Sequence, residues 1–394
     1  MISRRNFLSA LAIPAASRAF GATTAGRTRS IQDGLETLIA ANEIPGVVTL
    51  VASRTGITHF AAQGHADVHQ RVPMRKDFIF AIASMSKPIT GSAVMMLQDE
   101  GKLSIEDPVA KFIPQLGELK LADGRPATIT LKHMMTHTSG MGEATPQESE
   151  AAKKLEDLME AFASKPVAFP PGSAWKYCQS GINSLCRVVE VVSGMTFPEF
   201  LERRLFAPIG MKSTTFYPTE RQLPRLVTPC QQEAHPSATP QQVANRLVEV
   251  TTDHFQKEYI LRRDRPALGN GGLYSTAEDY SLFARMMLNG GEWKGRRYLS
   301  AAAVKQMTSI QTGDLKAGFL PGSGWGLTVG IVREPQGVTA MLSPGTFGHG
   351  GAYGTQAWID PVKGVALILM IQRVGLKNSD DSDMRRVFQE AAMS

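Results

Sequence analysis

The chain has 394 residues, of which 43% are hydrophobic and 20% charged, as is usual for a soluble globular protein. The formal net charge is +6, and three of these charges (Arg4, Arg5 and Arg18) lie in the first 21 residues, which contain no acid. Because no run of like charges remains elsewhere, nucleic acid is not an expected partner. Three cysteines, an odd number, do not form a disulfide framework.

The N-terminus carries a twin-arginine pattern, Arg4-Arg5, followed by a modestly apolar stretch and then small residues around 19–22. This order predicts an export signal over residues 1–25, and a periplasmic or secreted protein. The alternative is a basic amphipathic first helix. The apolar stretch is too short to span a bilayer, and no other run of 18 apolar residues exists. We therefore expect no membrane span after the signal is removed.

Residues 26–394 are predicted to form a single catalytic domain of the α/β (α+β) class. Residues 31–43 have the apolar spacing of a helix, and 47–53 with 57–64 form a predicted hairpin. Helical patterns follow over 84–100, 128–136, 151–163, 178–193, 197–204 and 276–289. Strands return at 325–332, 348–359 and 365–372, before a last helix at 380–392. An antiparallel sheet from the terminal regions, 31–83 and 290–394, is thus expected with helices around it and a mostly helical insertion, 84–289.

Three local predictions accompany this arrangement. The run from Ser275 to Glu278 is a capping box at the start of the 276–289 helix. Residues 222–245, rich in proline and glutamine, are interpreted as a surface excursion. Cys178 and Cys186 share one predicted helix, where a separation of about 12 Å excludes a bridge between them.

Ser84 and Lys87 have the Ser-x-x-Lys spacing, which puts both side chains on one face of a helix. A lysine desolvated beside a serine can lose its charge and accept the hydroxyl proton. Ser173 and Lys176 repeat the spacing, but in a loop after Pro170-Pro171-Gly172. Ser84 instead follows a strand-like run and opens a long apolar helix, with Pro88 near its start. The context favours Ser84 as the nucleophile.

Two further segments carry chemistry. Tyr177 is a candidate second proton carrier if nearby cations such as Lys87 lower its pKa; the alternative is an aromatic residue packed at a helix start. His349-Gly350-Gly351 precedes a predicted strand, where two glycines permit close approach of a substrate or of another segment. The alternative is a glycine turn with a surface histidine.

These segments belong to a set of motifs in one order, and through them nearly the whole mature chain resembles the serine β-lactamase and penicillin-binding-protein-like superfamily. Within it, the chain is most similar to the class C β-lactamase and family VIII carboxylesterase branch. The motifs are FAIASMSKPIT at 80–90, TLKHMMTHTSGM at 130–141, PPG at 170–172, GGLYST at 271–276 and GHGG at 348–351.

The resemblance implies a β-lactamase-like fold and an acyl-enzyme on Ser84, with Lys87 and Tyr177 as general base and acid. It implies an oxyanion hole from the N–H groups of Ser84 and Ala352, without cofactor or metal. Substrate-binding roles would fall to the residues of the third motif and to the tyrosine motif, namely His349, Gly350, Gly351 and Gln179.

The chain departs from the β-lactamase pattern at two positions. Gln179 replaces the asparagine that contacts a substrate amide, and His349 replaces the lysine that helps to bind a substrate carboxylate. The sequence therefore favours small-molecule esters or amides as substrates. A β-lactamase or D-Ala-peptidase stays open as an alternative, as does a penicillin-binding sensor or pseudoenzyme without turnover. His133 and His137 have zinc-like spacing but lack the glutamate of that motif, so a structural role is expected.

Overall fold

The computed structural model describes residues 24–234 and 245–394. The export signal predicted for residues 1–25 lies outside the described residues, apart from its last two positions. Those two positions begin helix α1, which spans Thr24–Ala40 and so starts and ends earlier than the predicted helix 31–43.

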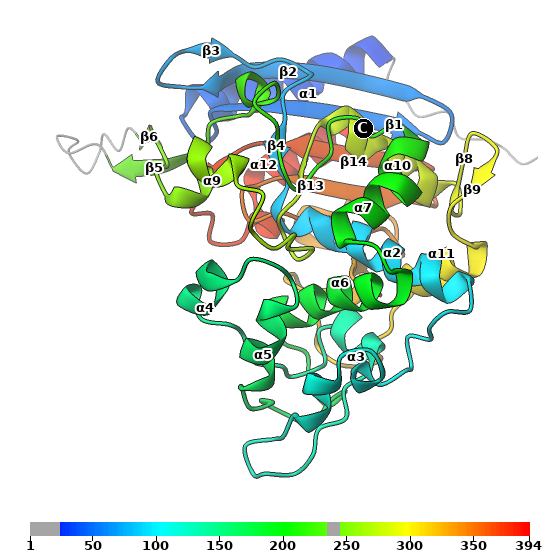
Figure 1. Cartoon of the computed structure of the whole chain (residues 1–394). Coiled ribbons are helices and arrows are strands. Elements are labelled where there is room, and N and C mark those ends of the chain that lie inside the picture. The colour runs from blue at the N-terminus through cyan, green and yellow to red at the C-terminus, as the bar shows by residue number, and fades with distance from the viewer. Residues whose placement is uncertain (1–23, 235–244) are drawn as a thin grey trace, which may run out of the picture.

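One eight-stranded antiparallel sheet joins the two ends of the chain (Figure 1). Strand β1 (Gly46–Ser53) pairs on one side with β2 (Ile57–Asp67) and on the other with β14 (Val365–Met370). The predicted hairpin and the predicted union of terminal strands are therefore confirmed. The remaining strands are β3 (Val72–Pro73), β10 (Ser323–Trp325), β11 (Gly330–Val332), β12 (Phe347–Gly350) and β13 (Gln356–Asp360).

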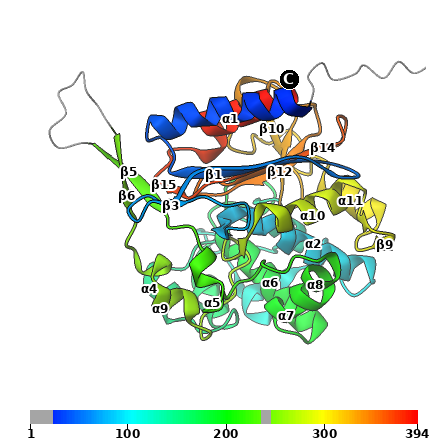
Figure 2. The ribbon, with the colours of Figure 1, turned by 90° about the horizontal axis from the view of Figure 1, so that it is seen from above.

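Both faces of the sheet are covered by helices, which explains why β1 is buried along nearly all its length. Val47 and Val51 join a core with α1 and α12 (Asp383–Met393). Val48 and Leu50 alternate with them and join the larger core beneath α2 (Ser86–Asp99) and α10 (Ala277–Leu288). Figure 2 shows α1 and α12 over one face and α2 and α10 against the other.

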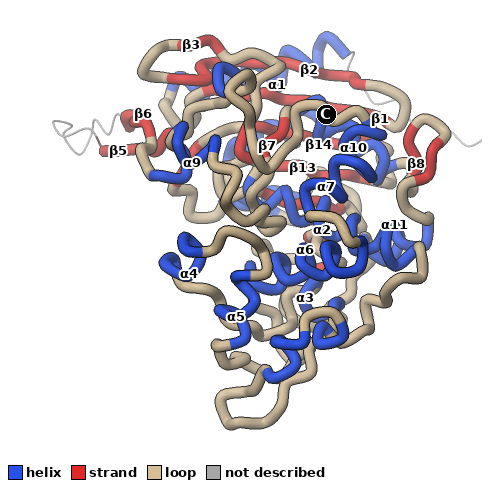
Figure 3. Tube along the Cα trace, in the orientation of Figure 1, coloured by secondary structure: helices blue, strands red, loops and turns tan. Residues whose placement is uncertain are grey.

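Most regular elements of the inserted region are helices, as predicted, with long loops between them (Figure 3). Its central helix α6 (Gln179–Ser193) packs against α2 and α3 (Leu131–Met135). A π-helical turn joins α7 (Phe197–Leu201) to α8. The other helices of the fold are α4 (Pro146–Ala151), α5 (Asp157–Ala163), α8 (Ala207–Ile209), α9 (Lys257–Leu261) and α11 (Ala301–Met307).

Two predicted strands are each divided in two by a turn. Between β10 and β11, Gly326 N–H donates to Val329 O at 2.9 Å, and Thr328 has a positive φ of 65°. The predicted strand 348–359 is interrupted at residues 351–355 between β12 and β13. At the first turn Leu327 and Val329 are buried in the larger core, so the apolar sequence pattern continues although the backbone reverses.

Two smaller differences concern local structure. The N-cap of α10 is Thr276, which accepts from Asp279 N–H, whereas Ser275 lies in β7 (Tyr274–Ser275). The capping box predicted to start at Ser275 is therefore wrong by one residue. Within the predicted surface excursion, β5 (Cys230–Ala234) forms a small sheet with β6 (Asn245–Glu249) and β15 (Arg373–Val374). Short strands β4 (Phe80–Ala81), β8 (Glu292–Trp293) and β9 (Arg296–Arg297) complete the fold.

Candidate active site

Ser84 lies where strand β4 turns into helix α2. A single 3₁₀ turn, Ala83–Met85, makes the connection, as the strand-then-helix pattern predicted. Ala83 adopts a left-handed conformation with φ of 45°, which is costly for a residue other than glycine. Ser86 Oγ donates to Ala83 O at 2.7 Å and supports this turn. The sharp reversal places Ser84 at the beginning of α2.

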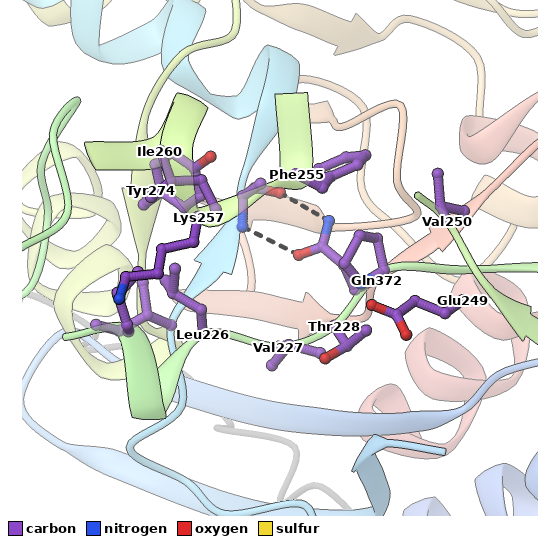
Figure 4. Close-up of a pocket in the computed structure, with 14 residues that line it drawn as sticks. Leu226, Val227, Thr228, Glu249, Val250, Phe255, Lys257, Ile260, Tyr274 and Gln372 are labelled. Atoms are coloured by element: carbon purple, nitrogen blue, oxygen red, sulfur yellow. Dashed lines mark hydrogen bonds between the residues drawn. The ribbon is translucent and has the colours of Figure 1, made fainter. Parts of the chain in front are cut away.

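The strand before Ser84 is tied to the main sheet by one side chain. Ala81 N–H donates to Gln372 Oε1 at 3.0 Å, and Gln372 Nε2 donates back to Ala81 O at 3.3 Å (Figure 4). Gln372 follows β14, an interior strand of the large sheet, so that sheet anchors the segment that leads to Ser84. These two hydrogen bonds border a cavity of about 240 Å³. Leu226, Ile260 and Tyr274 are among the residues that line it (Figure 4). Ser84 does not line that cavity.

Lys87 is buried one helical turn beyond Ser84. Its Nζ donates to Ser84 Oγ at 3.0 Å and to Asn270 O at 2.6 Å. Burial lowers the pKa of Lys87 to about 7, against a smaller opposing effect of the nearby Glu143 carboxylate. A substantial fraction of Lys87 is therefore uncharged at neutral pH. An uncharged amine at this distance can accept the proton of the Ser84 hydroxyl.

Tyr177 lies between Lys87 and His349. The ammonium of Lys87 is 4.6 Å from the centre of the Tyr177 ring, and the Tyr177 hydroxyl is 3.3 Å from His349 Nε2. Burial raises the pKa of Tyr177 above its ordinary value, while hydrogen bonding to Ser84 opposes the rise. The lowering of this pKa by a nearby cation, which the sequence analysis gave as a condition for proton transfer by Tyr177, is therefore not found. The phenol therefore keeps its proton at neutral pH and can donate a hydrogen bond.

His349 is buried and neutral. Its Nδ1 lies 2.6 Å from Gly350 O, and because a carbonyl only accepts, Nδ1 carries the proton. Nε2 is then free to accept from the Tyr177 hydroxyl. Burial, reinforced by the charge of Lys87, lowers the pKa of His349 to about 3. A surface histidine, the alternative considered from the sequence, is thereby excluded.

His137 supports Tyr177 from behind, a role that the sequence did not reveal. Its Nδ1 accepts from Cys178 N–H at 3.1 Å, and its ring centre is 4.4 Å from that of Tyr177. His133 instead belongs to the N-terminal cap of α3. In residues 24–234 and 245–394, no cluster of three or more His, Cys, Asp or Glu side chains could hold a metal ion.

Two polar residues that the sequence analysis did not identify, Asn270 and Glu143, form hydrogen bonds with Gln179 at one side of the site. Asn270 Nδ2 donates to Gln179 Oε1 at 3.0 Å, while the Asn270 carbonyl accepts from Lys87. Glu143 accepts from the N–H groups of Gln179 and Ser180 at 2.6 and 2.9 Å, and so caps the start of α6. The position of Asn270 just before the GGLYST motif was the one available signal.

These side chains open onto a cleft of about 420 Å³. Of the residues singled out from the sequence, those lining it are Ser84, Tyr177, Gln179, His349, Gly350 and Ala352. Gly351 instead faces the nucleophile segment, where an added Cβ would lie 2.6 Å from Ile82 O. Ser173 is apart from the cleft and exposed, with its hydroxyl donating to Pro170 O at 2.6 Å.

Known proteins are similar to this chain in sequence and in fold. Esterase EstB of Burkholderia gladioli is 27% identical over 347 residues, covering 82% of this chain and 85% of the esterase. Penicillin-binding protein 4 of Amycolatopsis lactamdurans is 28% identical over 360 residues, covering 90% and 87%. The solved structure of EstCE1, described as a hydrolase with promiscuous acyltransferase activity, superposes with a TM-score of 0.79 at 21% identity, covering 94% and 99%.

The family assignment rests on nearly the full length of the described chain. The family model named Beta-lactamase matches residues 31–392, which include the nucleophile turn, the central helices and the last strands of the sheet. The chain therefore belongs to the beta-lactamase family of serine hydrolases.

Proposed function

We propose that this protein hydrolyses carboxylic esters or amides through an acyl-enzyme on Ser84. The observation that carries the proposal is the 3.0 Å contact between Lys87 Nζ and Ser84 Oγ, made by a lysine whose pKa is lowered to about 7. A charged lysine would hold the serine hydroxyl without activating it. Burial leaves a fraction of the amine with a free lone pair near neutral pH.

The proposed reaction has two halves. Ser84 Oγ bonds to the substrate carbonyl carbon while Lys87 takes its proton, and the N–H groups of Ser84 and Ala352 stabilise the oxyanion. The bond to the leaving group breaks as Tyr177 donates a proton to it. Lys87, which took the serine proton, restores that of Tyr177. Water then attacks the acyl-enzyme, gives up a proton through the same pair, and releases the acid and free Ser84.

We propose esters rather than β-lactams as the preferred substrates, because His349 is neutral. A β-lactam carries a carboxylate, which a neutral imidazole with a pKa near 3 does not attract by charge. We expect kcat/KM for a p-nitrophenyl ester to exceed that for nitrocefin at pH 7.5. His349→Lys should move this ratio toward nitrocefin by roughly tenfold, as one charge-assisted hydrogen bond would.

His349→Gln is the matched control for that experiment. Glutamine removes the imidazole but adds no charge, so it should slow both substrates without moving the ratio toward nitrocefin. If the unmodified enzyme already prefers nitrocefin, the ester assignment is wrong and a β-lactamase replaces it.

A β-lactamase or D-Ala-peptidase is the second candidate, favoured by the similarity to Penicillin-binding protein 4. A sensor that is acylated without turnover is the third. A steady-state panel of short esters, nitrocefin and D-Ala-D-Ala peptides separates all three. A sensor would show a single burst of one product per Ser84 and then no further release.

We also propose that the protein is exported by the twin-arginine route to the periplasm or beyond. The sequence Arg4-Arg5 before a short apolar stretch supports this proposal. Arg4→Lys combined with Arg5→Lys should keep the precursor in the cytoplasm, because the paired guanidinium groups are the recognised feature. Cell fractionation followed by immunoblotting measures this, with Arg18→Lys as the control. Normal secretion of the double variant would exclude the twin-arginine route.

No helix in the described parts of the chain has both the length and the apolar character needed to cross a membrane.

A further inference from the structure

Phe319 is a large apolar residue at the mouth of the cleft. Its relative exposure is 39%, although most large apolar side chains of the protein are buried. It lines the same cavity as Ser84 and Tyr177. An apolar ring held open to solvent beside a nucleophile gains stability when an apolar group covers it.

The ring of Phe319 is held by other aromatic side chains. Its centre lies 4.9 Å from that of Tyr177, 5.7 Å from that of Trp175 and 5.9 Å from that of Trp325. All three contacts are edge-to-face, the geometry that aromatic pairs favour. The uncovered part of the Phe319 ring is therefore presented to the cleft in a defined position.

The backbone of Phe319 is held by a second segment of the chain. Asn378 Nδ2 donates to Phe319 O at 3.1 Å, and Asn378 also lines the cleft. This hydrogen bond joins two segments that are 59 residues apart in the chain, one following α11 and one preceding α12. The position of Phe319 in the cleft is thus fixed by a second segment of the chain as well as by its own loop.

Tyr177 indicates which half of an ester meets Phe319. In the proposed reaction Tyr177 gives its proton to the leaving alcohol, so the alcohol oxygen lies beside the Tyr177 hydroxyl. Phe319 packs directly against Tyr177, whereas Lys87 lies on the Tyr177 ring at 4.6 Å deeper in the site. An alcohol group that extends from its oxygen toward the open cleft therefore passes Phe319.

We propose that Phe319 binds the alcohol portion of the substrate, and that the preferred substrates are carboxylic esters of aromatic alcohols. This inference rests on the proposed function. The enzyme would then select its substrates by the alcohol, which is the leaving group. An aromatic ring on the alcohol would pack on Phe319 and cover the exposed part of its surface.

The test compares three esters with Phe319→Ala. Benzyl acetate places a ring on the alcohol, ethyl phenylacetate places it on the acyl group, and ethyl acetate has none. The ratio of kcat/KM for benzyl acetate to that for ethyl acetate should fall about tenfold, the size expected for one lost aromatic contact with its buried area. The ratio for ethyl phenylacetate should stay unchanged. Phe319→Tyr keeps the ring and should keep both ratios.

Controls separate this inference from a general loss of activity. Ile57, also 39% exposed but on β2, serves as the matched position, and Ile57→Ala should leave all three rates unchanged. Asn378→Asp removes the donor to Phe319 O but keeps the oxygen that accepts from Asp380 N–H. It should lower the benzyl acetate ratio in part, and it tests this hydrogen bond without changing the ring.

The inference is overturned if Phe319→Ala does not lower the benzyl acetate ratio, or if it lowers the ethyl phenylacetate ratio as much. Ethyl acetate hydrolysis that persists in Ser84→Ala would instead contradict the proposed function. The two failures are therefore distinguishable within one set of assays.

Discussion

Ser84→Ala should abolish ester hydrolysis, with kcat lowered by more than about 10⁴-fold, while the protein stays folded. The nucleophile has no substitute, and removing one from a serine hydrolase costs about 10⁶ in kcat. Ser84 is only partly buried, and its hydrogen-bond partner Lys87 also donates to Asn270 O, so alanine leaves the lysine with a hydrogen bond. Steady-state hydrolysis of p-nitrophenyl acetate, together with a thermal melt, measures both outcomes.

Ser173→Ala is the matched control, because Ser173 has the same Ser-x-x-Lys spacing in a loop outside the cleft. It should retain full activity. Mass spectrometry after treatment with a fluorophosphonate probe should locate the adduct on the peptide containing Ser84. An adduct on the Ser173 peptide would contradict the assignment of the nucleophile.

Lys87→Ala and Tyr177→Phe should each lower kcat/KM by about 10² to 10⁴, the usual contribution of a general acid or base. The double variant should lose far less than the product of the two effects, because the residues move the same protons. The pH profile gives an independent measure. Since Lys87 must lose its proton to act as a base, kcat/KM should rise with pH through about 7, and this limb should vanish in Lys87→Ala.

Lys176→Ala is the control for charge alone, because Lys176 is exposed next to Tyr177. It should leave both the rate and the pH profile unchanged. Near-normal rates in both Lys87→Ala and Tyr177→Phe would show that the proposed proton transfers are wrong.

Local sequence patterns were enough to predict the hairpin at the N-terminus and most helices, because each depends on apolar spacing over adjacent residues. The spacing of Ser84 and Lys87 also predicted their contact, since a helix brings i and i+3 together. Turns were harder to find. The chain reverses at Gly326 and Thr328, inside an apolar run. Because the residues next to this turn are also buried, the sequence has the pattern of one uninterrupted strand.

The parts of the site that escaped prediction depend on contacts between distant segments. Asn270 reaches Lys87 from a position 183 residues away, and His137 reaches the backbone of Cys178 from 41 residues away. The rise in the pKa of Tyr177 also escaped prediction. It is caused by burial, and residue spacing in the sequence does not show how deeply a side chain is buried. Charge proximity alone suggested a lowered pKa, whereas desolvation in the folded protein is the larger effect.

The pairing of β1 with β14 has a consequence for synthesis on the ribosome. β1 ends at Ser53 and its partner begins at Val365, so about 310 residues must be translated before that edge can close. At about 5 to 20 residues per second, the apolar edge of β1 waits roughly 15 to 60 s for its neighbour. Such an unpaired edge is a template for aggregation, so the nascent chain is exposed to this risk until β14 emerges.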